Sequence, residues 1–242
     1  TGAQIPLVDF RTDALGNLVN SFNLALFDIP EVIVCFGSYI IRGNRTVKLH
    51  ADDFEAYESP NYPLLGEIGV TIRIHWNLVR KKNKKKLSIL KKFNEVIIYH
   101  IQLLPTDNGK VLIKLLELKP DAIIIGGYGI GNAPTDEPLF LDALKLAEQS
   151  NIIIVDTTQC IFGTVDLSKY GTGVALEQYS VIGALDMTVE SAYGKLFYLF
   201  NKHKNKVKKI RGEFIKDLRG EITSKRRTIE PILPTSITKW SA

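Results

Sequence analysis

The sequence predicts an α/β fold with two domains, each built around a parallel sheet. Short runs of Ile and Val alternate along the chain with segments whose apolar residues recur at helical spacing. Apolar runs without polar interruptions are typical of strands that helices cover on both faces. The length of 242 residues and a hydrophobic content of 45% allow one large or two small domains with a sizeable core.

The first half of the chain contains one predicted helix followed by one predicted strand. Within residues 17–27 apolar residues recur at the spacing of one helix face, and Pro30 closes the connection that follows. The apolar run at residues 32–36 predicts a buried strand over residues 31–39.

The second half of the chain repeats the alternation of strand and helix. This order predicts a doubly wound unit, in which helices lie on both faces of a parallel sheet. The predicted strands are residues 96–104, 122–126 and 152–156, and the predicted helices are residues 109–118, 139–149, 175–178 and 190–200.

Two basic runs, at residues 80–92 and 202–211, contribute much of the net charge of +5. Such runs can bind phosphate backbones or anionic lipid, but a solvated linker and a solvated helix surface are the favoured interpretation. We therefore expect no nucleic acid and no membrane as partner. The predicted domains are residues 1–79 and 93–224, joined by a basic linker at 80–92 and followed by a frayed tail at 225–242.

The distribution of cysteine and histidine indicates a reducing compartment and no metal site. Cys35 and Cys160 lie inside apolar stretches and show no pattern of paired half-cystines. The four histidines lack the spacing of metal ligands, and no apolar run reaches 18 residues. We therefore expect a cytoplasmic protein without a metal or cofactor.

Two segments are candidates for a functional site on their residues alone. A glycine cluster at residues 126–132 follows a predicted strand, where an open α/β sheet binds its ligands. Its spacing differs from GxGxxG, so a tight turn that lets the backbone approach a ligand or a neighbouring subunit is favoured over a dinucleotide site. Lys48 ends the motif RGNRTVK at residues 42–48. It is either a salt-bridge partner or a lysine whose lowered pKa lets it deprotonate a hydroxyl nucleophile.

The sequence resembles the type I (cytoplasmic) L-asparaginases in an ordered set of motifs that covers residues 1 to about 224. The matching motifs are TGAQIPL (1–7), RTD (11–13), NL (17–18), PEV (30–32), RGNRTVK (42–48), SPN (59–61), YGIGNAP (128–134), TQC (158–160), YGTG (170–173), DMTVE (186–190) and DLRGE (217–221). The resemblance implies an asparaginase/glutaminase-like fold. It also implies hydrolysis of L-asparagine to L-aspartate and ammonia through a threonine acyl-enzyme, in a homodimer or homotetramer.

The resemblance also implies roles for individual residues. Lys48 falls on the lysine of the family's Thr-Asp-Lys arrangement, Ala3 on a position beside the scissile amide, and Asn132 on a loop that faces the active site of an adjoining subunit. The family nucleophile lies in a TGGT segment, and a second threonine and the aspartate lie in an HGTDT segment. Neither segment occurs in this sequence. We therefore expect the chain to be a fragment that is inactive on its own.

The resemblance further implies a degenerate allosteric site. Bacterial family members bind a regulatory asparagine with an arginine before the glycine loop, a threonine before the catalytic lysine, and the TQC segment. Here these positions are Gly126, Val47, and Thr158, Gln159 and Cys160. Because glycine cannot supply the bidentate grip of arginine on a carboxylate, we expect activation by asparagine to be lost or much weakened. Cys160 is either regulatory or a small buried apolar residue.

Two other functions remain open from the sequence. The chain could be the asparaginase-like subunit of a tRNA-dependent amidotransferase, which the basic linker favours slightly. It could also be a non-catalytic interaction protein, since Lys48 alone cannot hydrolyse an amide without a nucleophile and an oxyanion site.

Overall fold

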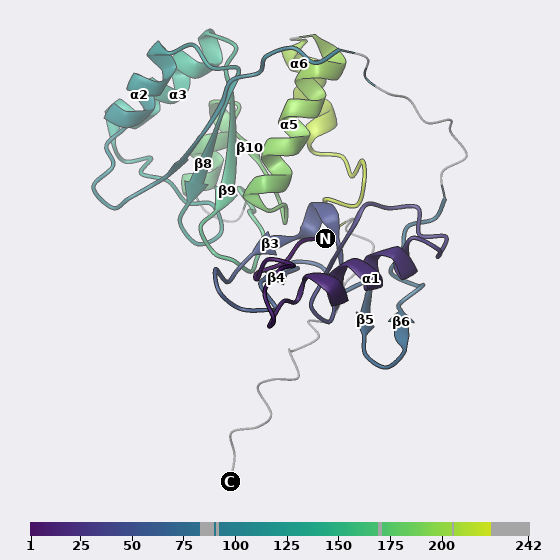
Figure 1. Cartoon of the computed structure of the whole chain (residues 1–242). Helices are drawn as coiled ribbons and strands as arrows, with labels where there is room; N and C mark the ends of the chain where they lie inside the picture. Colours follow the sequence, from purple (N-terminus) through teal and green to yellow (C-terminus); the bar gives the residue numbers. More distant parts are fainter. Residues whose placement is uncertain (83–89, 91, 169–170, 205, 224–242) are drawn as a thin grey trace.

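A four-stranded parallel sheet forms the centre of the second half of the chain, in the order β10-β9-β8-β7 (Figure 1). The computed structural model describes residues 1–82, 90, 92–168, 171–204 and 206–223. Strands that neighbour one another in this sheet are also consecutive in sequence, so the crossover helices pack on one common face. The strands are β7 (Ile98–Gln102), β8 (Ala122–Gly127), β9 (Ile153–Thr158) and β10 (Ile182–Gly183).

Helices cover both faces of this sheet, as the sequence predicts. On one face α2 (Lys110–Glu117), α3 (Pro138–Gln149) and α4 (Gly171–Gln178) pack over Ile123 and Ile125. On the other face α5 (Val189–His203) and α6 (Val207–Phe214) pack over Ile124 and Val155 (Figure 1). Alternate residues of β8 thus enter two separate cores, and this confirms the predicted α/β class.

The described strands of the first half pair antiparallel, which the sequence did not predict. The sheet order is β1-β2-β5-β6, with β1 (Ile33–Phe36), β2 (Tyr39–Arg42), β5 (Gly66–Ile68) and β6 (Ile72–Ile74). The single strand predicted over residues 31–39 is wrong, because the chain reverses at residues 37–38 into a hairpin. Gly37 has φ +57°, a conformation that glycine adopts without steric cost. A two-residue connection can only join antiparallel strands.

The other elements of the first half are one helix, one 3₁₀ turn and a small two-stranded sheet. α1 (Ala14–Leu24) begins three residues before the predicted helix and buries Leu24 in a core with Ile40 and Leu65. A 3₁₀ turn (Gly43–Arg45) leads into β3 (Val47–Lys48), which pairs antiparallel with β4 (Tyr57–Glu58). The turn and β3 therefore give the RGNRTVK motif its shape.

The bounds of helix α6 were not predicted from the sequence, although the basic run at residues 202–211 was interpreted as a solvated helix surface. Lys208 and Lys209 are exposed, and only Ile210 and Phe214 of this helix are buried. Two buried positions among charged residues give a weak periodic signal. No helix in the described parts of the chain is long and apolar enough to cross a membrane.

Residues of the two halves contact each other directly. Arg45 of the 3₁₀ turn forms an ion pair with Asp186, with 2.8 Å between Nη1 and Oδ2. Asn61 donates to the carbonyl oxygen of Asp186 at 3.2 Å and accepts from the backbone N–H of Gly163 at 2.8 Å. The predicted linker lies mostly outside the described residues and the predicted tail lies wholly outside them, so the domain limits stay predictions.

Candidate functional site

Lys48 lies at the end of β3 with its ammonium group beside the first residues of the chain. Its Nζ donates a hydrogen bond to Oε1 of Gln4 at 3.3 Å, and the side chain is exposed. The ring centroid of Tyr57, on the paired strand β4, lies 5.8 Å from Nζ. Gln4 in turn donates to the carbonyl oxygens of Ala51 and Asp53 at 3.0 and 2.9 Å. The residues following Gly2 and those following Lys48 therefore form one local structure.

The segment that contains Ala3 is fixed from the start of α1. Asp13 accepts from the backbone N–H of Gln4 at 3.1 Å and from that of Ile5 at 3.0 Å. Asn17 donates to the carbonyl oxygen of Gly2 at 3.0 Å. Partial burial raises the pKa of Asp13, but these backbone N–H groups and the amide of Asn17 outweigh it and hold the pKa below its usual value. Ala3, between two anchored neighbours, is exposed.

Asn132 ends a closed loop that follows β8, and we call residues 127–132 the glycine loop. The backbone N–H of Tyr128 donates to the carbonyl oxygen of Asn132 at 2.8 Å, and the reverse bond is also 2.8 Å. Gly129 and Gly131 have φ of +51° and +105°. Thr172 donates its hydroxyl to Oδ1 of Asn132 at 2.6 Å. The predicted tight turn after a strand is therefore confirmed, and it fixes the side chain of Asn132.

The TQC segment follows β9 and joins the same edge of the sheet. Thr158 donates its hydroxyl to the carbonyl oxygen of Gly129, and its Oγ1 accepts from the backbone N–H of Cys160 at 2.9 Å. Gln159 donates from Nε2 to the carbonyl oxygen of Gly126 at 2.8 Å. Cys160 is a free, exposed cysteine. The interpretation of Cys160 as a buried apolar residue is therefore wrong, because the chain leaves the sheet before it.

The structure leaves space for a Cβ atom at Gly126. A Cβ built there lies 3.5 Å from Cγ of Gln159 and 3.6 Å from Nε2 of His100, which are ordinary van der Waals contacts. Its φ is not positive, so glycine is not required for the backbone of β8. Neither the backbone conformation nor the space at the Cβ position therefore requires glycine here.

The predicted site residues fall into two groups within this chain. Ala3, Val47 and Lys48 lie together in the first half, with Val47 opposite Glu58 on β4. Gly126, Asn132, Thr158, Gln159 and Cys160 lie together at the carboxyl edge of the parallel sheet. No hydrogen bond or ion pair among the described residues joins the two groups.

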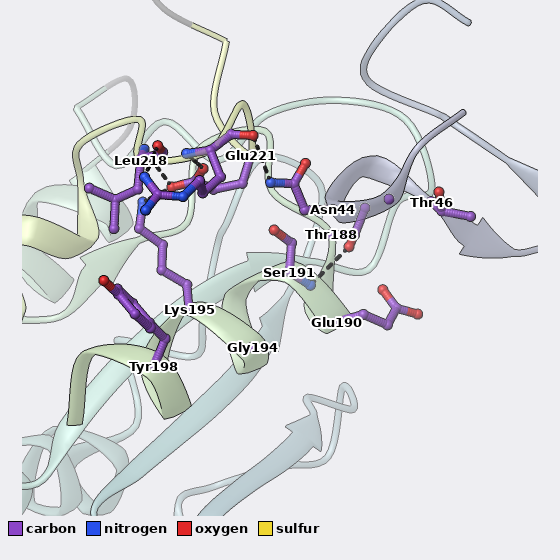
Figure 2. A pocket seen from close by; sticks show the side chains of 12 residues that line it. Asn44, Thr46, Thr188, Glu190, Ser191, Gly194, Lys195, Tyr198, Leu218 and Glu221 are labelled. Atoms are coloured by element: carbon purple, nitrogen blue, oxygen red, sulfur yellow. Dashed lines mark hydrogen bonds and ion pairs between the residues drawn. The ribbon is translucent and has the colours of Figure 1, made fainter. Parts of the chain in front are cut away.

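A cavity of about 310 Å³ lies between the two halves, next to the first group (Figure 2). Helix α5 supplies Glu190, Ser191, Gly194 and Tyr198 to its wall, and Thr46 lies across from them. Thr188 begins α5 by accepting from the backbone N–H of Ser191 at 3.1 Å. Between Ser191 and Tyr198 in the helix, Lys195 pairs with Glu221 at 2.6 Å, and both side chains are almost fully buried.

Two groups near the predicted site were not recognised from the sequence. Gln4 contacts Lys48 but stands in the sequence only as one letter of the TGAQIPL motif. Asp156 is fully buried in β9, and neither of its oxygens has a well-formed hydrogen bond with a described residue. A carboxylate that continues an apolar run such as residues 152–155 is a signal that could have identified it. No cluster of three or more His, Cys, Asp or Glu within the described ranges could hold a metal ion.

Comparison with known proteins gives the chain relatives over most of its length. Relatives include L-asparaginase 1 of Escherichia coli (strain K12), 38% identical over 92% of this chain and 65% of that protein. A glutamyl-tRNA(Gln) amidotransferase subunit of Methanosphaera stadtmanae is 31% identical over 92% of this chain and 52% of that protein. The crystal structure of L-asparaginase I from Vibrio cholerae matches with a TM-score of 0.85 and 36% identity, over 92% of this chain and 67% of that one.

Two family models divide the chain between them. Residues 1–80 match the model described as Asparaginase, N-terminal, and residues 98–214 match the Glutaminase/Asparaginase C-terminal domain. The order of the two models agrees with the order of the motifs along the sequence. The first model covers the strands of the antiparallel sheet, and the second covers those of the parallel sheet. The chain therefore belongs to the glutaminase/asparaginase family.

Proposed function

We propose that the protein to which this chain belongs is an L-asparaginase that converts L-asparagine to L-aspartate and ammonia. The names of its E. coli and V. cholerae relatives support this assignment. The chain spans 65% of the E. coli relative, and its residues include neither TGGT nor HGTDT. In this proposal the threonine nucleophile is not among these 242 residues. Lys48 is the residue of this chain that we propose to take part in the reaction.

The contact between Lys48 and Gln4 is the observation that carries this proposal. It brings the predicted catalytic lysine to the TGAQ segment, whose Ala3 we propose to lie beside the scissile amide. In this chain the ammonium group is exposed. A substrate and a nucleophile that bind over it would exclude water from the Lys48 amine. The lysine could then accept the hydroxyl proton of the nucleophile as the acyl-enzyme forms.

We further propose that the working enzyme is a homodimer or homotetramer in the cytoplasm. Asn132 is proposed to contact substrate, yet it belongs to a different group from Lys48 within one chain. A site that uses both residues would take them from two subunits. Apolar side chains on the surface of the first half support such an assembly, since Val8 and Phe10 have relative exposures of 94% and 104% and Leu26 has 85%.

We propose that the enzyme lacks activation by asparagine. Gly126 offers no guanidinium, and Val47 offers no hydroxyl. In addition, the side chain of Gln159 contacts the carbonyl oxygens of Gly126 and Leu103, at 2.8 and 2.7 Å. These bonds hold it over the space that a larger residue at position 126 would enter.

Ammonia release by the full protein from its own cells tests the proposal, and its intact mass shows how much sequence accompanies the 242 residues. We expect a hyperbolic dependence of rate on asparagine concentration. The substitution Lys48→Ala should lower kcat by about 10²- to 10⁴-fold, because it removes the proton acceptor. Lys145→Ala, at an exposed helix position, is the matched control and should leave the rate unchanged. A sigmoidal curve would contradict the loss of activation, and an active Lys48→Ala variant would contradict the role of Lys48.

The relationship to a glutamyl-tRNA(Gln) amidotransferase subunit supports a second candidate function. In that case the protein would act together with tRNA, and the basic run at residues 80–92 would contact phosphates. Salt-sensitive binding of tRNA, with a steep loss of affinity between about 50 and 200 mM salt, would favour this candidate over the simple asparaginase. If the full protein neither releases ammonia nor binds tRNA, the remaining interpretation is a non-catalytic family member.

A further inference from the structure

Asp156 is a fully buried carboxyl group packed directly beneath the glycine loop. It lies in β9 opposite Ile125 of β8 and Gly183 of β10, on the face that carries α2 and α3. Its relative exposure is 0%, and neither oxygen has a well-formed hydrogen bond with a described residue. A polar group in this situation is costly, and an ionised one is far more costly.

The glycine loop is shaped to make room for this carboxyl group. A Cβ at Gly127 would lie 2.6 Å from Oδ1 of Asp156, and a Cβ at Gly131 would lie closer still to Oδ2. The same Cβ at Gly127 would lie 3.0 Å from the carbonyl oxygen of Asn132. Both oxygens therefore lie directly against the backbone of Gly127 and Gly131, with no side chain of the loop between them.

We infer that Asp156 is a neutral carboxylic acid in the folded protein and that its neutral state allows the glycine loop to pack against the sheet. Asp156 is then a positioning residue that acts on Asn132 through the loop backbone. The consequence for substrate binding rests on the proposed function, whereas the protonation state of Asp156 does not. Loss of the proton would leave a buried charge without an opposite charge beside it, and the loop would have to open to admit water.

The surroundings of Asp156 agree with this inference. Burial raises its pKa well above the usual range, and the backbone N–H of Gly127 offsets only part of that rise. The titratable groups on the segments packed around it are Tyr128 in the loop and Asp166 in the segment after β9. Burial and the charge of Asp107 raise the pKa of Tyr128, so its phenol stays neutral. Asp166 accepts from the hydroxyl of Ser168 at 2.6 Å. No charged side chain in the described chain contributes to the pKa of Asp156.

The sign of the effect follows from the raised pKa. When the folded-state pKa of a carboxyl group exceeds its unfolded value of 3.8, the group adds to the free energy of unfolding. This contribution is fully present below pH 3.8. This contribution to the free energy of unfolding is lost as the pH rises through the folded-state pKa. The variant Asp156→Asn has nearly the same shape, stays neutral and should not show the loss.

Thermal unfolding of the chain and of Asp156→Asn between about pH 4 and 9 tests the inference. We expect the melting temperature of the unmodified chain to fall relative to the variant by about 3 °C or more as the pH rises. Asp142→Asn, at an exposed position of α3, makes the same chemical change and should give no such difference. A flat difference curve for Asp156→Asn, or one that rises with pH, would overturn the inference.

Hydrogen exchange localises the effect without requiring any enzyme activity. Exchange at residues 127–132 should rise with pH beyond the intrinsic rate in the unmodified chain and not in Asp156→Asn. If that variant does not fold, NMR titration of the Gly127 and Gly131 amides in the unmodified chain decides the matter. A midpoint well above pH 4 supports a neutral Asp156, and a midpoint at or below pH 4 excludes it. An inactive protein that passes these tests would refute the proposed function and leave the inference standing.

Discussion

Arg45 is a fully buried guanidinium group whose charged and polar partners come from the second half of the chain. Nη1 pairs with Asp186 at 2.8 Å, Nε donates to the carbonyl oxygen of Gly220 at 2.7 Å, and Nη2 donates to Thr223 at 3.2 Å. Burial of this charge is costly, and the planar fork of donors offsets the cost with several bonds at once. The hydrogen bonds of Arg45 therefore fix the orientation of one half relative to the other.

Removal of the Arg45 side chain should destabilise the protein strongly. We expect Arg45→Ala to lower the free energy of unfolding by about 3 to 5 kcal/mol, because it removes the cationic partner of Asp186 and the nearer arginine donor of the Gly220 carbonyl oxygen. The control is Lys114→Ala, which breaks an exposed pair with Glu117 and should cost less than about 1 kcal/mol. Denaturant unfolding of both variants measures the difference, and equal losses would show that Arg45 is dispensable.

Glu213 should make the protein sensitive to acid. The hydrogen bond from Lys202 and the imidazole of His203, whose Nε2 lies 3.0 Å from Oε2, lower the pKa of Glu213 to about 2. Its favourable contribution to the free energy of unfolding is present above the ordinary value of 4.5 and is lost as the pH falls towards 2. Unfolding of Glu213→Gln between pH 5 and 2 should therefore show a smaller acid effect than the unmodified chain. Glu177→Gln, at an exposed position of α4, should behave like the unmodified chain.

At the scale of the elements, the sequence predicted β7, β8 and β9 of the parallel sheet closely and missed the two-residue strand β10. The predicted strand 122–126 is β8 (Ala122–Gly127), because an unbroken apolar run is buried on both faces. The hairpin of β1 and β2 was missed although Gly37-Ser38 separates two apolar runs, a two-residue break that is typical of a hairpin turn. Motif order identified Lys48, whereas its partner Gln4 depends on a fold contact between residues 44 positions apart.

The start of α5 offers a test of one element. Thr188 is the N-cap residue, and its hydroxyl accepts from the backbone N–H of Ser191 at 3.1 Å. Thr188→Ala leaves that N–H without a partner and should lower the free energy of unfolding by about 1 kcal/mol. Thr188→Ser keeps the hydroxyl and should lose much less. Equal losses for the two variants would mean that the methyl group of Thr188, rather than the cap, supplies the stability.

At the scale of the whole molecule, the two groups of predicted site residues are the main result that sequence could not give. Lys48 belongs to the half with the antiparallel sheet, and Asn132 belongs to the edge of the parallel sheet. Motifs report which residues are present, but their spatial relation depends on how the halves pack. That packing rests on side chains such as Arg45, whose complete burial the sequence does not reveal.

The contact between Arg45 and Asp186 also bears on how the protein is made. The two residues are 141 positions apart, and Gly220 is 175 positions from Arg45. At about 5 to 20 residues per second, the ribosome needs roughly 7 to 30 s after Arg45 to synthesise its first acidic partner. During that interval Arg45 of the newly made first half is unpaired, and the surface that later contacts the second half is exposed. The contacts of Arg45 can therefore be completed only after the DLRGE motif at residues 217–221 has left the exit tunnel.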